Sequence, residues 1–186
     1  MSNHSSVPAP SAPVFAHRRT IDCQSARRED GLWELQATLH DFKGTPFPTA
    51  TGGKVMPGEA LHHMQLTLVF NDALTIQTAQ TRLFSGPAPD CHHVDTSYDA
   101  LIGMTLGPGF SRQAQERFGG IRGCTHMNEL LPIATTVAIQ TVLAKRMEGG
   151  TAVLKAYAPA FVNQCYTWRS DGPAIQSINN ATYKDV

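Results

Sequence analysis

The first half of the chain alternates apolar and polar residues with a period of two, which is the pattern of half-buried β-strands. Residues 32–39 (LWELQATL) follow this alternation, and the extended segment at residues 14–23 could pair with them. Residues 64–70 alternate again, and residues 74–79 return as the second arm of a hairpin after the turn signal Asn71-Asp72. Together these segments predict an antiparallel β-meander of three to five strands.

Helical spacing replaces this alternation in the second half. Residues 111–118 predict a short helix with Ser111 as its N-cap. Residues 127–147 form the longest helical candidate, and Pro132 lies in its first turns, where it marks the start or imposes a kink. Residues 152–157 predict one further strand. Strands followed by helices define an α+β fold with the helices packed on one face of the sheet.

Length and composition favour a single domain of ordinary character. The chain has 186 residues, of which 41% are hydrophobic. Residues 1–13 are rich in Ser, Pro and Ala, so we expect them to be disordered and residues 14–186 to form one α+β domain. Fifteen basic and fifteen acidic residues give a net charge of zero. That balance argues against nucleic acid or an anionic membrane surface as a partner.

Neither a secretory signal nor a membrane span is expected. Residues 1–13 have no apolar core, and the most apolar stretch, residues 127–143, is interrupted by polar residues and a proline. The four cysteines are far apart, which favours free thiols or metal ligands over disulfides. We therefore expect a cytoplasmic protein, and the sequence is compatible with a homo-oligomer.

Side chains that bind transition metals gather in three short segments: residues 61–64 (LHHM), 91–93 (CHH) and 124–126 (CTH). A hairpin returns its end close to its beginning, so the first two segments should meet at one end of the sheet. The third lies at the start of the long helix, where the helix dipole favours a thiolate. Zn²⁺ and Fe²⁺ prefer thiolate and imidazole ligands. The candidate metal ligands are His62, Cys91, Cys124 and His126.

Two further residues are candidates for moving a proton beside such a metal ion. His126 and Glu129 are three residues apart and share one helix face, so Glu129 could serve as a general base. His63, next in sequence to a candidate ligand, could do the same. The ordinary alternatives are surface histidines, a helix-capping glutamate and buried cysteines that act as small hydrophobic residues. Cys23 and Cys165 lack neighbouring histidines, and we interpret them as structural.

Several motifs carry a family resemblance. They are residues 30–33 (DGLW), residues 58–64 (GEALHHM), Cys91, residues 107–110 (GPGF) and the run GGIRGCTHMNELL from residue 119. With them the chain resembles the bacterial domain-of-unknown-function family number twenty-eight eighty-nine, over about residues 14–145. An acidic residue is common in that family at the position of His63. The resemblance implies no assigned activity.

The order of hairpin, cysteine, helix, then cysteine and histidine at a long helix is also similar to the NifU-like iron–sulfur scaffold fold. Carried over by position, the ligands of that fold would be near His62, at Cys91, and at Cys124 with His126. The first scaffold cysteine has no counterpart at residues 60–62. The resemblance therefore implies a zinc or iron site rather than cluster assembly.

We accordingly expect a metal-dependent enzyme, using Zn²⁺ or Fe²⁺, that acts on a small, weakly charged organic molecule of aromatic or acyl type. Lyase chemistry (an aldol-like C–C cleavage) is slightly favoured over hydrolysis. Two alternatives are an iron–sulfur or sulfur-transfer scaffold and a non-catalytic ligand-binding domain. On this hypothesis Cys124→Ala and His126→Ala each remove the metal, and Cys23→Ala leaves it bound.

Overall fold

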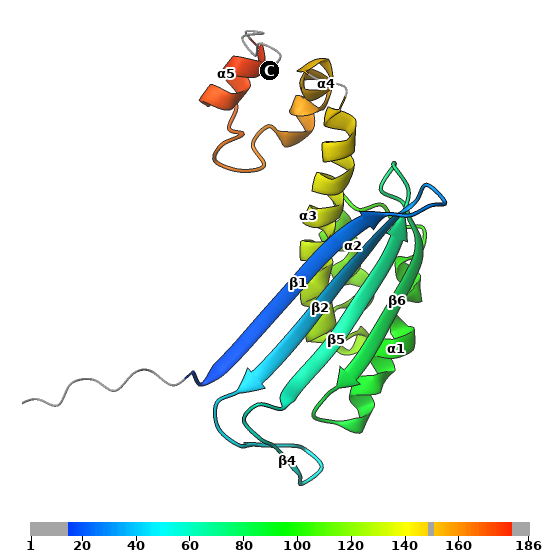
Figure 1. The fold of residues 1–186 in the computed structure, drawn as a ribbon, viewed down its shortest axis with the longest axis vertical. Helices are drawn as coiled ribbons and strands as arrows, with labels where there is room; N and C mark the ends of the chain where they lie inside the picture. Colours follow the sequence, from blue (N-terminus) through cyan, green and yellow to red (C-terminus); the bar gives the residue numbers. More distant parts are fainter. Residues whose placement is uncertain (1–14, 149–150, 180–186) are drawn as a thin grey trace, which may run out of the picture.

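The computed structural model describes residues 15–148 and 151–179. Residues 1–13, expected to be disordered, lie outside the described part. Four long strands form one antiparallel sheet in the order β1-β2-β5-β6 (Figure 1). The strands are β1 (His17–Arg27), β2 (Trp33–Lys43), β5 (Ala60–Phe70) and β6 (Ile76–Ser85). A small hairpin of β3 (Phe47–Pro48) and β4 (Lys54–Val55) lies between β2 and β5. The predicted antiparallel meander is confirmed.

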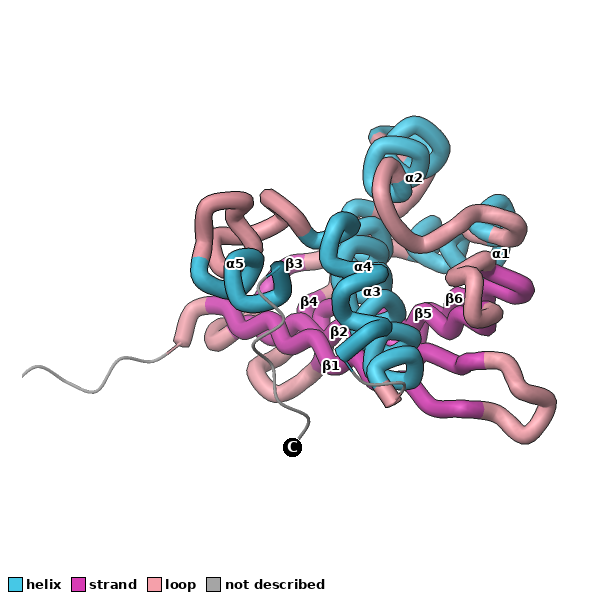
Figure 2. Tube along the Cα trace, turned by 90° about the horizontal axis from the view of Figure 1, so that it is seen from above, coloured by secondary structure: helices cyan, strands magenta, loops and turns pink. Residues whose placement is uncertain are grey.

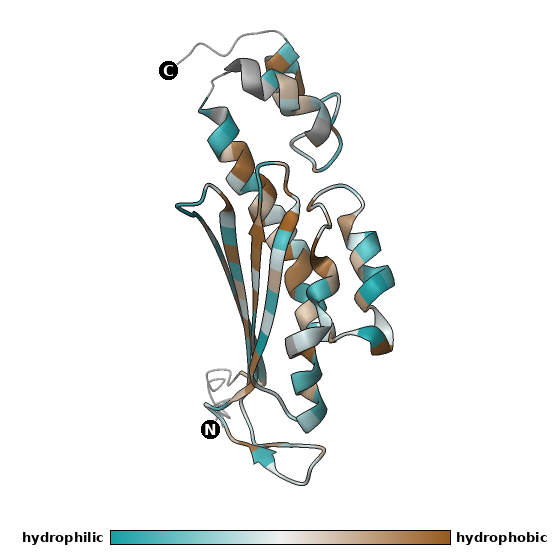
Figure 3. Cartoon of the chain, turned by 90° about the vertical axis from the view of Figure 1, so that its right-hand side faces the viewer, coloured by the Kyte–Doolittle hydropathy of each residue, from teal (hydrophilic) through white to brown (hydrophobic). Residues whose placement is uncertain are grey.

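The helices lie on one face of this sheet, as predicted. Viewed from above, the strands form one layer and the main helices a second (Figure 2). Strand β2 shows why: its inward residues from Trp33 to Leu39 are buried, while the residues between them are partly exposed. The inward residues of β5 from Met64 to Phe70 are buried in the same way. Apolar side chains therefore gather between the sheet and the helices. The strands and the long helix both carry strongly hydrophobic residues (Figure 3).

The segment between β6 and the long helix consists of short helical pieces. In chain order they are η1 (Pro89–His93), α1 (Val94–Ser97), η2 (Asp99–Leu101), α2 (Phe110–Phe118) and η3 (Gly120–Arg122). Helix α2 confirms the predicted short helix, but its N-cap is Gly109 rather than Ser111. Gly109 has φ +84°, a left-handed conformation that glycine adopts readily, and this turn places Phe110 in the core.

Helix α3 (Thr125–Met147) confirms the long helix predicted from the sequence and contacts β1, β2 and β5. It begins two residues earlier than expected, with Cys124 as the N-cap residue in an extended conformation. The stretch Thr125–Arg146 is long and apolar enough to span a membrane by length and composition. Its residues Leu130, Ala134, Ala138 and Val142 are nevertheless buried in the core, on the face that packs against the sheet.

The predicted strand at residues 152–157 is wrong, because this segment belongs to helix α4 (Thr151–Phe161). Alanine, leucine and lysine in this stretch favour a helix. Helix α4 packs against α3 and α5 (Pro173–Asn179), away from the sheet edges (Figure 1). Without an adjacent strand, this segment packs on other helices instead, and Ala158 of α4 is buried there.

Candidate metal centre

Three polar side chains form one row across the sheet, where β2 ends and β5 begins. The strand register pairs Arg19 of β1 with Asp41 of β2, and Asp41 with His62 of β5. An irregularity follows at once, because Phe42 pairs with Ala60 and leaves Leu61 as an extra residue. Such a β-bulge re-aims side chains at a sheet edge. Asp41 and His62 are both buried, on the side of the sheet that the helices cover.

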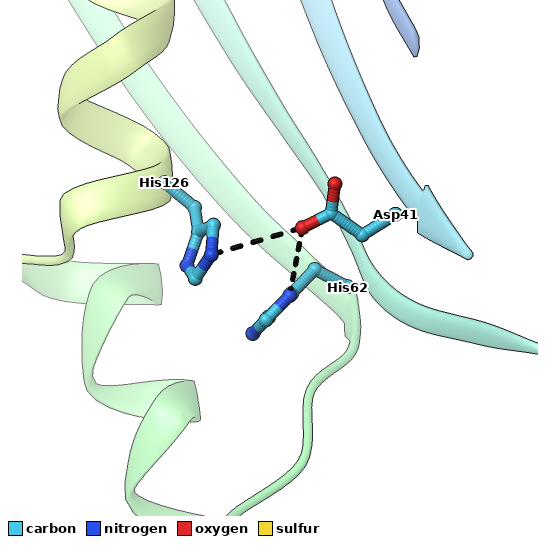
Figure 4. Close-up of side chains that lie close together, drawn as sticks. All are labelled: Asp41, His62 and His126. Atoms are coloured by element: carbon cyan, nitrogen blue, oxygen red, sulfur yellow. Dashed lines mark hydrogen bonds and ion pairs between the residues drawn. The ribbon is translucent and has the colours of Figure 1, made fainter. Parts of the chain in front are cut away.

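Helix α3 adds a fourth side chain, His126, beside Asp41 and His62. The Nδ1 atom of His62 lies 3.0 Å from Oδ2 of Asp41, and Nε2 of His126 lies 3.7 Å from the same oxygen (Figure 4). One possible ligand atom from each residue lies within 4.8 Å of the others. The two imidazole rings lie against each other at an interplanar angle of 32°, with centroids 3.8 Å apart. Two imidazoles and one carboxylate thus converge from two strands and a helix; we call them the Asp–His–His group.

The carboxylate at the centre is fully buried and ionised. Two nitrogens of Arg19 hold the two oxygens of Asp41, each at 2.7 Å. The Nε2 atom of His17 lies 3.3 Å from Oδ1. Burial alone would raise the pKa of Asp41, but the hydrogen bonds and charge of Arg19 outweigh it and lower the pKa to about 2.

Arg19 also joins this carboxylate to a second one. Its Nη1 atom donates to Oε2 of Glu129, which lies one helical turn after His126. The hydrogen bond to Asp41 above all, together with that to Glu129, raises the pKa of Arg19 above its ordinary value despite partial burial. Two carboxylates against one guanidinium leave one net negative charge when the histidines are neutral. This surplus favours a bound cation.

Both histidines of the group are in the form that binds metals. Burial lowers the pKa of His62, although its hydrogen bond to Asp41 opposes the shift. Burial also lowers the pKa of His126, and the nearby His62 and Arg19 act in the same direction. A ligating imidazole must be neutral, so the group holds its three donors in the required protonation states at neutral pH.

A buried tyrosine fixes the start of α3, and with it His126. The hydroxyl of Tyr98 accepts a hydrogen bond from the backbone N–H of Cys124 at 3.0 Å and donates to Oδ1 of Asn128 at 2.7 Å. The amide of Asn128 in turn donates to the backbone oxygen of Phe118 at 2.7 Å. Burial raises the pKa of Tyr98 to about 12, so the hydroxyl keeps its proton.

The predicted cysteine ligands do not join the Asp–His–His group. The Sγ atom of Cys124 lies 3.9 Å from Nδ1 of His126, whereas Asp41 faces the other ring nitrogen, Nε2. Cys91 lies in η1, and both thiols line a separate cavity of about 270 Å³ together with Ser97. The three predicted segments do meet at one end of the fold, but strand register supplies Asp41 where a thiol was expected.

The two predicted proton carriers have different positions. Glu129 lies beside the group and is 43% exposed. His63 lies on the opposite face of the sheet, because successive residues of a strand point to opposite faces. There it stacks between His40 and Phe84, with ring centroids at 4.0 and 4.3 Å. This position does not allow His63 to move a proton at the Asp–His–His group.

Sequence reasoning missed Asp41, Arg19 and His17. A signal for Asp41 was present: it continues the inward face that runs from Trp33 to Leu39, where a carboxylate is buried only with a partner. Arg19 likewise lies on the same face of its strand as Ile21. A charged residue that extends an apolar strand face could therefore have been identified as a site residue.

The fold and the site define a class: an α+β protein with a four-stranded antiparallel sheet and a group of metal-ligand type between sheet and helix. The chain belongs to the family described as "Protein of unknown function (DUF2889)", whose model matches residues 17–140. That match includes the Asp–His–His group together with Arg19 and Glu129. No curated protein and no solved structure matches the chain significantly, so the NifU-like similarity is not shown.

Proposed function

We propose that this protein is a metal-dependent enzyme whose Zn²⁺ or Fe²⁺ ion is held by Asp41, His62 and His126. The observation that carries the proposal is the convergence of three ligand atoms within 4.8 Å, all in residues with a buried or partly buried side chain. Two histidines and one carboxylate are the ligand set of non-haem Fe²⁺ oxygenases and also suit zinc. Three protein ligands leave open positions, which is typical of a catalytic rather than a structural site.

A metal ion held there would polarise a carbonyl or alkoxide oxygen, or activate water. Glu129 is the residue best placed to take or give a proton, because it is partly exposed and follows His126 by one turn of α3. Arg19 orients Asp41 through two hydrogen bonds and contacts Glu129 with its remaining nitrogen. Its charge also keeps Asp41 ionised. Arg19 therefore acts as a positioning residue for both carboxylates.

A lyase that cleaves a C–C bond in an aldol-like manner remains our preferred reaction class, with hydrolysis second. A cavity of about 270 Å³ is lined by Cys91 and by Cys124, whose Sγ atom lies 3.9 Å from Nδ1 of His126. This volume is just below the usual 300–1,000 Å³ of small-molecule pockets, so the cavity would admit only a small substrate. An overall net charge of zero agrees with a weakly charged substrate of aromatic or acyl type. Free cysteines among the described residues favour the cytoplasm.

The iron–sulfur scaffold has less support. Iron–sulfur clusters are held mainly by cysteine thiolates. The thiols of Cys91 and Cys124 lie outside the Asp–His–His group, and the remaining two cysteines lie in β1 and after α4. A mononuclear zinc or iron site fits the imidazole and carboxylate donors better.

The test begins with elemental analysis of the full chain purified without a metal-affinity tag. We expect close to one equivalent of zinc or iron, and a large loss of it in Asp41→Asn. The loaded protein is then incubated with aromatic and acyl β-hydroxy carbonyl compounds and esters, and the products are identified by mass spectrometry. Aldol-type cleavage gives two carbonyl fragments, whereas hydrolysis gives an acid and an alcohol.

Asp22→Asn is a matched control, because Asp22 is exposed on β1, away from the site. Turnover by the loaded protein and by Asp22→Asn, but not by Asp41→Asn, supports the proposal. Failure of the untagged protein to bind added Zn²⁺ or Fe²⁺ in stoichiometric amounts would overturn it. Equal metal content in both variants would do so as well.

A further inference from the structure

A second cavity lies toward the other end of α3, between α3, α4 and the loop before α2. Its volume is about 440 Å³. Its apolar wall is formed by Pro108, Ile139, Leu143, Tyr157 and Phe161. A helix rises about 1.5 Å per residue, so Arg146 at this cavity lies roughly 30 Å along α3 from His126. None of the residues that line the cavity belongs to the Asp–His–His group, so the two sites are separate.

The wall of this cavity has the character of a ligand site. Pockets for small molecules are usually about 300–1,000 Å³ in volume and are lined by aliphatic and aromatic side chains with a few polar groups. Here α3 contributes aliphatic side chains and α4 contributes aromatic ones, and the polar groups are Arg146 and Gln164. An apolar body would be held by the wall, and a polar head by these two residues.

The charge around the cavity is positive. The guanidinium of Arg146 stacks on Tyr157, 4.7 Å from the ring centroid, and donates to the backbone oxygen of Asp72. The carboxylate of Asp72 is already held by Arg27 at 2.6 Å and by the indole N–H of Trp33 at 2.8 Å. Two guanidiniums thus face one carboxylate, which leaves one unbalanced positive charge at the rim.

We propose that this cavity binds an amphiphilic monoanion, with an apolar aromatic or short acyl body and a carboxylate directed at Arg146 and Gln164. The apolar wall would bury the body, and Arg146 has further N–H donors for a carboxylate. The binding is non-catalytic, because the site is remote from the Asp–His–His group.

This site belongs mainly to a part of the chain that the family model does not match. The match ends at residue 140, whereas Leu143, Arg146, Tyr157 and Phe161 follow it. The ligand would therefore be a property of this chain rather than of the whole family. Neither the metal nor the proposed reaction is needed for the binding, so the two proposals can fail separately.

Isothermal titration of the metal-free full chain tests the proposal. The probes are 2-naphthoate for an aromatic body, decanoate for an acyl body and 2-naphthalenemethanol as the uncharged analogue of the first. We expect one equivalent of at least one acid to bind. Arg146→Gln should weaken the binding of that acid by about tenfold, which is the effect of losing one charge-assisted hydrogen bond. The affinity for the alcohol should be unchanged. Leu143→Trp, which fills the cavity, should abolish all binding.

Arg169→Gln is the matched control, because Arg169 stacks on the exposed ring of Tyr166 outside this cavity. It should bind the acid like the unmodified chain. Circular dichroism and thermal melting show whether each variant is folded, and Arg146→Gln remains informative if Leu143→Trp is not. The proposal is overturned if neither acid shows saturable binding. Equal affinity of Arg146→Gln and Arg169→Gln for the acid does the same.

Discussion

His62 is the direct cross-strand partner of Asp41, and its Nδ1 atom lies 3.0 Å from the carboxylate oxygen Oδ2. The sheet therefore supplies two of the three proposed ligands through its register alone. The third, His126, reaches the same oxygen only when α3 packs on the sheet. Formation of the complete site is thus coupled to docking of the helix, and a metal ion bound there should stabilise that docking.

Replacement of His62 should remove the metal, while replacement of its neighbour should not. His62 and His63 are adjacent in β5 but lie on opposite faces of the sheet, so they form a matched pair. We expect added Zn²⁺ to raise the melting temperature of the original chain and of His63→Gln, but not that of His62→Gln. The measurement is thermal unfolding with and without the ion, followed by addition of a chelator.

In that experiment the chelator should reverse the stabilisation of His63→Gln. An equal response of the two variants to zinc would mean that the ion binds elsewhere. A loss of the response in His63→Gln alone would assign the site to the open face of the sheet.

Asp41→Asn should destabilise the metal-free protein by about 2 kcal/mol, because a buried ion pair loses one partner while the other charge stays in place. Glu129 still contacts Arg19 and limits the loss. Urea unfolding at neutral pH measures the change. Asp22→Asn should alter stability by less than about 0.5 kcal/mol, as is usual for an exposed position. A similar change in both variants would contradict a structural role of the buried pair.

The sequence predicted the sheet, its meander order and the long helix, since each rests on a local period of apolar residues. It also predicted that hairpin closure brings residues 61–64 and 91–93 to one end of the sheet, and that residues 124–126 join them if the long helix packs back on the sheet. It did not predict Asp41, since the choice of an imidazole's partner depends on the register between β2 and β5. The strand prediction for residues 152–157 was wrong for a related reason. This segment is apolar enough for a strand or a helix, and it forms a helix that packs on α3.

Cys124→Ala should keep the metal, which reverses the expectation from the sequence. The thiol lies 3.9 Å from Nδ1 of His126, on the ring nitrogen that does not face Asp41. Its loss leaves Asp41, His62 and His126 in place. Elemental analysis of Cys124→Ala beside His126→Ala checks this, with the metal retained in the first and lost in the second. Loss in both would restore the cysteine as a ligand.

Tyr98→Phe should loosen the start of α3 and weaken metal binding without changing a ligand. The hydroxyl bonds to the backbone N–H of Cys124 and the side chain of Asn128, and its removal leaves both without this partner. An unsatisfied buried group costs about 1–3 kcal/mol. We expect a lower free energy of unfolding and faster hydrogen exchange at residues 124–128. Tyr166→Phe, at an exposed position, is the control and should change neither quantity.

The stability of the metal-free protein should fall in acid in two steps, and the pKa shifts give the direction of each. The folded-state pKa values of His62 and His126 lie below the ordinary 6.5, so as pH falls below 6.5 the unfolded chain takes up protons first. The folded state is then disfavoured.

The second step belongs to Asp41, whose pKa is about 2 in the folded state and 3.8 ordinarily. Its contribution to the free energy of unfolding is therefore present above pH 3.8 and is lost as the pH falls toward 2. Urea unfolding between pH 7.5 and 2 follows both steps. His62→Gln should flatten the step below pH 6.5, because glutamine does not titrate, whereas His93→Gln, at an exposed position, should leave it unchanged. A free energy of unfolding that rises as the pH falls from 6.5 to 5 would show that these imidazoles are charged in the folded protein. Charged imidazoles cannot ligate a metal at neutral pH, so that outcome would also count against the metal centre.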